Sequence, residues 1–274
     1  MEKGESYVQY GVLSQQGAIE ALTKLNGSLH WKENCKILDV GCGPGNVTYD
    51  YILPKLPRST KEIIGIDISP DYIKYAELHY GKHPIFAYKL MDIVNGDVPN
   101  EYEQHFDYVV SFLCFQQFSN HKAAFEKIKR MLKSGGEMLC YFPTSTKSTE
   151  LFTFLAKQQK WNQYLCNYEM HCSPYKDSVD VESDVRRFVT DMQFKIVFFN
   201  YEERHYEFMD KNLPSAVRAI AYESLKIPED MYQQFQADAI KAFRDLNVMK
   251  FNENNEGYYD CFYKLVTFHI IKQP

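Results

Sequence analysis

A glycine-rich turn directly after a short apolar segment constrains the fold of this chain more than any other feature. Residues 37–46 read Ile-Leu-Asp-Val-Gly-Cys-Gly-Pro-Gly-Asn, with a glycine at every second position after the apolar segment. Glycine takes positive φ and lets a ligand approach the backbone without a Cβ in the way. A helix that begins after the turn presents free N–H groups. The segment therefore predicts a strand, a turn and a helix start that bind a nucleotide-like ligand.

The spacing of these glycines excludes two other phosphate-binding loops. A dinucleotide-binding turn needs glycine or alanine at the position that Asn46 holds here. A P-loop needs a Gly-Lys ending followed by Ser or Thr, and the turn lacks it. A glycine turn alone is also found in many ordinary βα units, so further residues must identify the ligand.

Two carboxylates follow the turn in the expected order. Asp67 ends the apolar segment 62–67, and Asp92 follows the segment 85–91. A doubly wound fold places at the first of these positions a carboxylate that accepts hydrogen bonds from ribose hydroxyls. The turn and both acids together predict a nucleotide-like cofactor.

The alternation of apolar and helical segments predicts an α/β fold, a Rossmann-like doubly wound sheet of seven mostly parallel strands. The further strands are expected at 105–112, 137–142, 194–201 and 262–271, with a turn at 133–136. Helices are expected at 7–25, 46–56, 70–80, 120–132, 149–161, 181–192 and 213–246. The helices after residue 142 have no place in the layers of the sheet, so we expect a helical insertion that covers the carboxyl ends of the strands and the site there.

A single domain accounts for all 274 residues. Its expected parts are an N-terminal helical segment, a cofactor-binding core, a two-part helical insertion on the acceptor side, and two terminal strands. Their bounds are 1–34 for the first, 35–142 for the core, 143–192 and 210–250 for the insertion, and 193–201 and 262–271 for the strands.

Composition excludes several partners. The chain has 31 basic and 36 acidic residues, a net charge of −5, and no basic run that would neutralise a nucleic-acid backbone. No apolar stretch is long enough to span a bilayer and no signal peptide is recognisable, so we expect a cytoplasmic protein without a membrane partner. The seven cysteines and eight histidines form no ligand pattern, which predicts no metal and no disulfide.

The glycine turn with its two acids resembles the cofactor motifs of class I S-adenosylmethionine-dependent methyltransferases. Nearly the whole chain, moreover, resembles the juvenile hormone acid O-methyltransferases of insects, which methylate the carboxylate of farnesoic or juvenile hormone acids. The residues that carry this resemblance are Tyr7, Trp31, Asp67-Ile68-Ser69, Lys74-Tyr75-Ala76, His79, Leu90, Asp92-Ile93, Phe106-Asp107, Val109, Ser111-Phe112, Lys160-Trp161 and Ser173-Pro174-Tyr175.

The resemblance implies S-adenosylmethionine as cofactor, with Asp92 at the adenine amino group. The cofactor-binding residues that it implies are Asp39, Gly41, Cys42, Gly43, Gly45, Asn46, Asp67, Ile68, Asp92, Ile93, Ser111 and Phe112. The acceptor-binding residues are expected to be Ser14, Phe115, Gln116, Trp161 and Tyr175.

The chain departs from this family at the acceptor. The family typically carries His-Trp where Gln116 and Gln117 stand, and glutamine where Ser14 stands. Because polar groups shaped for one acceptor discriminate against another, we favour a changed acceptor. A small hydrophobic phenol and a terpenoid carboxylic acid both remain open.

The two acceptor classes make different demands on catalysis. A carboxylate is already ionised, whereas a phenol, with a pKa near that of tyrosine, needs a base or a hydrogen-bond acceptor. The candidate catalytic residues are Gln15, Gln117, Tyr10 and His121. The alternative function is a non-catalytic relative that binds the cofactor or a hormone-like ligand. The sequence does not specify an oligomeric state.

Overall fold

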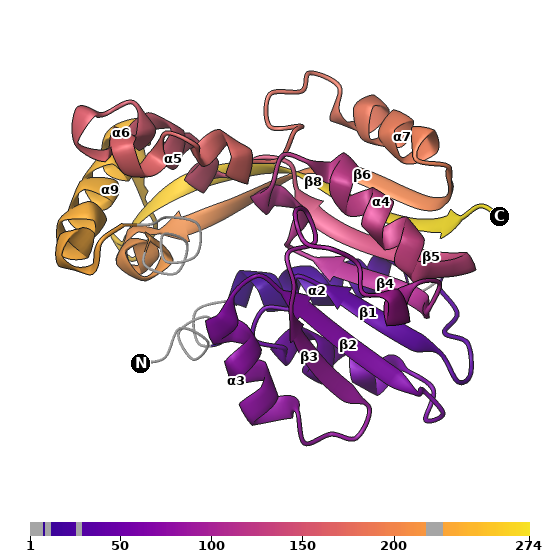
Figure 1. The fold of residues 1–274 in the computed structure, drawn as a ribbon. Coiled ribbons are helices and arrows are strands. Elements are labelled where there is room, and N and C mark those ends of the chain that lie inside the picture. Colours follow the sequence, from indigo (N-terminus) through magenta and orange to yellow (C-terminus); the bar gives the residue numbers. More distant parts are fainter. Residues whose placement is uncertain (1–7, 9–11, 26–28, 218–226) are drawn as a thin grey trace.

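The fold was analysed in a computed structural model of the chain, which describes residues 8, 12–25, 29–217 and 227–274 (Figure 1). The strands are β1 Lys36–Val40, β2 Glu62–Asp67, β3 Phe86–Leu90, β4 Phe106–Phe112, β5 Leu132–Pro143, β6 Phe194–Met209, β7 Met249–Phe251 and β8 Gly257–Lys272. The α-helices are α2 Val12–Leu25, α3 Pro70–Tyr80, α4 His121–Met131, α5 Lys147–Ala156, α6 Gln159–Leu165, α7 Val181–Asp191 and α9 Tyr232–Leu246.

The strands form one mixed sheet in the order β3-β2-β1-β4-β5-β8-β6, with β7 paired to β8. The pairs β3–β2, β2–β1, β1–β4 and β4–β5 are parallel, and β8 runs antiparallel to both β5 and β6. The order of the strands reverses between β1 and β4, and ligands of open α/β sheets bind at such a switch point. The predicted Rossmann-like doubly wound fold is confirmed.

The two faces of the sheet bury separate apolar clusters. The α4-side cluster contains residues of α4 and α7 with every second residue of the central strands, among them Leu38, Val40, Ile64, Phe115, Phe125, Ile128, Phe142, Val185 and Phe268. The α2-side cluster contains residues of α2 and α3 with the alternate strand residues, among them Ala18, Leu22, Ile37, Ile63, Ile73, Phe86, Tyr88, Tyr141 and Leu265. Since both faces are covered, the central strands are mostly apolar on both faces, as expected of a parallel sheet.

A third apolar cluster forms a helical lobe beyond the sheet. Both β6 and β8 are 16 residues long and continue together past the other strands toward α5, α6 and α9 (Figure 1). The lobe core contains Leu151, Phe152, Leu155, Trp161, Leu165, Tyr168, Leu213, Phe235, Ala239, Phe243, Tyr259 and Cys261. Helix α5 begins four residues after β5 ends, so the lobe rises from the carboxyl edge of the parallel strands.

Several element predictions were wrong in detail. The predicted helix 149–161 is two helices, and the segment 46–56 contains a π-helical and a 3₁₀ turn instead of a regular α-helix. The predicted turn 133–136 lies within β5, where Gly135 has a φ of +68° and the pairing with β4 shifts register.

The end of the chain also differs from the prediction. The two last predicted strands are longer, and the three-residue strand β7 was missed. Within the predicted helix 213–246, residues 227 and 228 are not helical, and residues 218–226 lie outside the described part.

Local sequence explains the helix starts that were predicted correctly. Ser69 caps α3, because its hydroxyl accepts a hydrogen bond from the backbone N–H of Tyr72, and Pro70 occupies the first helical position. Asn120 caps α4 in the same way through the N–H of Ala123. These caps fix where each helix leaves the carboxyl edge of the sheet.

Candidate functional site

The glycine turn after β1 lies at the switch point of the sheet. Gly41, Gly43 and Gly45 have φ values of +74°, +54° and +85°, a region that side chains with a Cβ rarely adopt. The N–H groups of Gly41 and Cys42 both donate to the carbonyl of Ile66 at the end of β2. The turn is therefore anchored to the neighbouring strand, and Gly41 and Gly43 remain partly accessible.

The three glycines meet different surroundings. A Cβ at Gly41 would lie 2.3 Å from the sulfur of Cys114, and one at Gly45 would lie 3.0 Å from the hydroxyl of Tyr88. Nothing lies within 4 Å of the position of a Cβ at Gly43. The turn is thus packed tightly at both ends and open in its middle, where a ligand can approach the backbone.

Asp39 supports the turn from below. Its carboxylate is buried and accepts a hydrogen bond from the hydroxyl of Thr48, in the π-helical turn after the glycines. Burial raises the pKa of Asp39 to about 7, against the opposite effect of the Thr48 hydrogen bond. Thr48 was missed by the sequence reasoning; its place three residues after Gly45, on the first turn of the crossover, was the available signal.

Asp67 links the turn to the second strand. One carboxylate oxygen accepts from the N–H of Gly43 at 3.0 Å, and the other accepts from the N–H of Ser69 at 2.8 Å. Burial raises the pKa of Asp67, and these backbone hydrogen bonds oppose the rise. The carboxylate lies beside the open middle of the turn, where further lone pairs can accept from a ligand hydroxyl.

Asp92 lies two residues after the end of β3 and shapes the loop that follows the strand. It accepts hydrogen bonds from the N–H of Val94 at 2.8 Å and from both the backbone and the side chain of Asn95. Burial raises the pKa of Asp92, but these bonds outweigh it and hold the pKa below its usual value. Asp92 is consequently a fixed negative charge at the edge of the site.

Exposed apolar side chains lie between these acids. Ile68 directly after Asp67 is 67% exposed, and Leu90, which pairs with Asp67 in the β2–β3 register, is 59% exposed. Ile93 beside Asp92 is buried. Exposed aliphatic groups flanked by carboxylates suit a ligand with a flat apolar ring and donor groups.

On the other side of the switch point, the loop after β4 closes against the turn. Ser111 is buried and its hydroxyl donates to the carbonyl of Val40 at 2.8 Å, and Phe112 is also buried. Leu113 has a φ of +55°, a strained conformation for leucine. Burial raises the pKa of Cys42 and of Cys114 far above the usual thiol value, so both thiols stay protonated.

Some buried polar atoms without a partner belong to the segments that form this site. Among the described residues, the side-chain oxygens of Asn46, Tyr88 and Gln116 are buried and make no hydrogen bond, as are one atom each of His83 and Thr267. Native structures pair nearly all such atoms, so each exception calls for an explanation. Asn46 and Gln116 flank the glycine turn on its two sides, one in the helix start after β1 and the other in the loop after β4.

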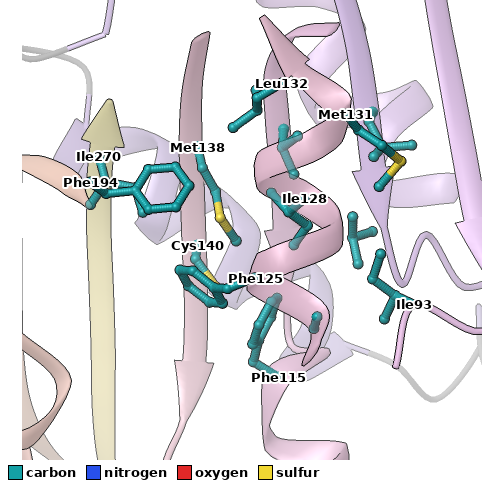
Figure 2. Packing of buried hydrophobic residues seen from close by; sticks show 14 of the residues in the cluster. Ile93, Phe115, Phe125, Ile128, Met131, Leu132, Met138, Cys140, Phe194 and Ile270 are labelled. Carbon is teal, nitrogen blue, oxygen red and sulfur yellow. The ribbon is translucent and has the colours of Figure 1, made fainter. Parts of the chain in front are cut away.

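Three residues predicted near the acceptor or the chemistry lie in the α4-side cluster. Phe115 is fully buried beside Phe125 (Figure 2), and Tyr175 is packed against the ring of His121. His121 itself is buried and its Nε2 lies 2.7 Å from the carbonyl oxygen of Phe115. Burial lowers the pKa of His121 to about 4. These contacts fix the loop after β4 from beneath.

The other predicted acceptor-side residues are spread over the molecule. Trp161 is fully buried in the lobe core, where its Nε1 donates to Asp238 at 3.1 Å. Gln117 is exposed beside the half-buried Gln116. Ser14 and Gln15 belong to α2, but their side chains, like the whole of Tyr10, lie outside the described part of the chain.

The described residues offer neither a metal-binding cluster nor a membrane-spanning helix. They contain no group of three or more His, Cys, Asp and Glu side chains placed to bind a metal ion. None of the helices in the described ranges has the length and apolar character needed to cross a membrane.

The sequence of the chain is similar to those of known methyltransferases. Residues 31–212 match the family model described as "Methyltransferase domain". The juvenile hormone acid O-methyltransferase of Drosophila melanogaster is 28% identical, with an alignment that covers 100% of this chain and 93% of the relative. The enzyme of the same name from Bombyx mori is 27% identical over 94% of this chain and 91% of its own.

A solved structure adds a likeness of fold. Phosphoethanolamine N-methyltransferase 2 of Haemonchus contortus, in complex with phosphomonomethylethanolamine and S-adenosylhomocysteine, superimposes with a TM-score of 0.51. The match covers 93% of this chain and 53% of that protein at 15% identity. At that identity the likeness shows the fold alone.

Proposed function

The chain belongs to the methyltransferase domain family, and from this premise we propose that it is an O-methyltransferase for a small hydrophobic acceptor. One observation carries the proposal: both insect relatives that match nearly the whole chain are O-methyltransferases. The chain is accordingly an S-adenosylmethionine-dependent methyltransferase with the resemblance to the juvenile hormone acid enzymes that its sequence predicts. The class of acceptor oxygen is the finer part of the proposal.

The residues at the glycine turn fit S-adenosylmethionine. The open space at Gly43 admits the ligand to the backbone, Asp67 lies beside it to accept from ribose hydroxyls, and Asp92 offers a fixed charge to the adenine amino group. The orphaned oxygen of Asn46 offers one more acceptor for a donor group. When bound, S-adenosylmethionine would supply an electrophilic methyl group to an oxygen nucleophile, and the thioether sulfur would be the leaving group.

The protein's own task is then mainly positioning. A displacement of this kind gains most from a nucleophile held near the methyl group in a pocket that excludes water. The packed loop after β4 and the side of the lobe that rises from the same edge would supply that enclosure. The acceptor would be a phenol or a terpenoid carboxylic acid such as farnesoic or juvenile hormone acid. No metal is proposed, and neither nucleic acid nor a membrane is proposed as a partner.

Cofactor binding and turnover can be tested separately. Calorimetric titration with S-adenosylhomocysteine should give micromolar affinity, and Asp67→Ala should weaken it about tenfold to hundredfold, because a charge-assisted hydrogen bond is lost. Incubation with methyl-labelled S-adenosylmethionine and parallel panels of farnesoic-type acids and para-substituted phenols should yield a labelled ether or ester. Absence of binding would refute the proposal, and binding without turnover on either panel would favour a non-catalytic relative.

A further inference from the structure

The side chain of Gln116 has one bonded and one unpaired end near the switch point of the sheet. Gln116 lies in the short 3₁₀ turn 115–117 after β4, between the fully buried Phe115 and the exposed Gln117. The same loop contacts the glycine turn through Cys114, whose sulfur packs against Gly41. The loop also contacts β5, because the N–H of Leu113 donates to the carbonyl of Tyr141. Gln116 therefore belongs to a loop that lies between the glycine turn and the carboxyl end of β5.

One half of the Gln116 amide is already engaged. Its Nε2 donates to the carbonyl oxygen of Leu113 at 2.7 Å. This contact fixes the orientation of the amide, because the flipped form would place two acceptor oxygens against each other. The carbonyl belongs to Leu113, whose backbone has the uncommon φ of +55°.

The other half has no partner in the protein. The Gln116 Oε1 is buried, makes no hydrogen bond, and can only accept. A carboxylate is also only an acceptor, so an ionised acid placed against this oxygen would be repelled. A neutral hydroxyl can donate to it, and a site that offers a buried hydrogen-bond partner discriminates strongly in favour of the group that fits.

From this arrangement we infer that Gln116 selects an acceptor that carries a neutral hydroxyl, of the phenol class, over an ionised carboxylic acid. The inference rests on the proposed function and names its substrate class. Gln116 binds and orients the hydroxyl; an amide oxygen is far too weak a base to remove the proton. Methyl transfer forms the new O–C bond and breaks the S–C bond, the bonding electron pair stays on sulfur, and the hydroxyl proton passes to water.

Two substitutions at Gln116 test the inference. Gln116→Met keeps the length of the side chain and removes both the acceptor oxygen and the donor to the Leu113 carbonyl, so kcat/KM for para-substituted phenols should fall about fivefold to tenfold, the value of one hydrogen bond. Gln116→Lys keeps a donor for the Leu113 carbonyl and exchanges the acceptor for a cation, so the ratio of acid to phenol turnover should rise by at least the same factor. Gln233→Met, the same change at an exposed position of α9, is the matched control and should leave the ratio unchanged.

The readouts separate this inference from the proposed function. Titration with S-adenosylhomocysteine should give dissociation constants within about twofold of one another for all variants. An equal loss of S-adenosylhomocysteine binding and phenol turnover in Gln116→Met would overturn the inference, because the oxygen would then serve the cofactor. Preferential turnover of acids by the unchanged protein would also overturn it, while leaving the O-methyltransferase assignment intact. Only a protein that neither binds the cofactor nor transfers methyl would refute both.

Discussion

The carboxyl edge of the sheet and the helical lobe above it differ in whether their buried polar groups have hydrogen-bond partners. At the edge, three glycines and Leu113 have positive φ, and the oxygens of Asn46 and Gln116 are buried without partners. In the lobe, the large polar aromatics are satisfied: the Nε1 of Trp161 donates to Asp238, and the hydroxyl of Tyr259 donates to Asp210, which also binds Arg244. The strained turn and the unpaired oxygens at the edge lower the stability of the free protein, and a bound ligand can compensate for this. The polar groups of the lobe are paired within the lobe and need no ligand.

This difference shows where function and stability reside. Strain and unpaired polar atoms cost folding free energy, and they persist where the surrounding structure fixes them and a ligand compensates. The lobe core is a separate apolar cluster around Trp161 and Phe235. Substitutions should therefore separate cofactor binding at the edge from stability of the lobe.

The largest expected effect on cofactor binding comes from adding one methyl group to the glycine turn. In Gly41→Ala the new Cβ would lie 2.3 Å from the sulfur of Cys114 at a φ of +74°, so the turn must shift. Strain of about 1–3 kcal/mol predicts about tenfold to hundredfold weaker binding of S-adenosylhomocysteine by calorimetry.

The matched control is Gly135→Ala in β5, also a glycine with positive φ, at +68°, but with nothing within 4 Å of its Cβ position. It should cost about 1 kcal/mol of stability and leave binding unchanged. Equal loss of binding in both variants would mean that backbone strain anywhere, and not the contact at the turn, controls the site.

The lobe is tested by emptying its core. Trp161→Ala removes the largest fully buried side chain among the described residues and should lower the free energy of unfolding by about 3–5 kcal/mol in urea denaturation. Acceptor turnover should fall with it, while S-adenosylhomocysteine binding should change less than about threefold, because the lobe core is separate from the glycine turn. Trp161→Phe keeps an aromatic ring beside Phe235 but loses the bond to Asp238 and part of the buried ring volume, which predicts a smaller loss of about 1–3 kcal/mol. If S-adenosylhomocysteine binding weakened in proportion to the loss of stability, the lobe and the glycine turn would not be independent.

The sequence was sufficient to predict the edge of the sheet because its chemistry is local. Gly41, Gly43 and Gly45 need positive φ within a few residues of one strand, and Asp67 follows from the end of the next one. Caps such as Ser69 before Pro70 mark helix starts within four residues. Patterns of this range require no knowledge of distant packing.

Features that depend on contacts between distant segments were not predictable. The extension of β6 and β8 arises because each lies against the other, and the alternation in their outer halves is too irregular to identify it. His121 was expected to take part in catalysis, but burial among aromatic rings from four segments of the chain leaves it neutral. The unpaired oxygen of Gln116 depends on the φ of Leu113 and on the Leu113 carbonyl that the amide meets, which no spacing rule describes.

The smallest expected effect is the net response of the unchanged protein to pH, because two buried groups on opposite faces of the sheet respond in opposite directions. Asp39 has its pKa raised from 3.8 to about 7, so the folded state holds its proton more tightly and stability falls as pH rises from about 4 to 7. His121 has its pKa lowered from 6.5 to about 4, so stability falls in the opposite direction, as pH drops from 6.5 to 4. Each effect is worth about 2 kcal/mol between pH 4.5 and 6.5.

Because the two contributions have opposite signs, they should nearly cancel in the unchanged protein over this interval. Asp39→Asn should leave the histidine effect, so that urea denaturation gives a free energy of unfolding that rises by about 2 kcal/mol from pH 4.5 to 6.5. His121→Gln keeps a donor for the Phe115 carbonyl and should leave the aspartate effect, with a fall of about the same size. The same slope in both variants would mean that neither buried group titrates as its surroundings require. Opposite slopes would show that burial raises the pKa of Asp39 on one face of the sheet and lowers the pKa of His121 on the other by similar amounts.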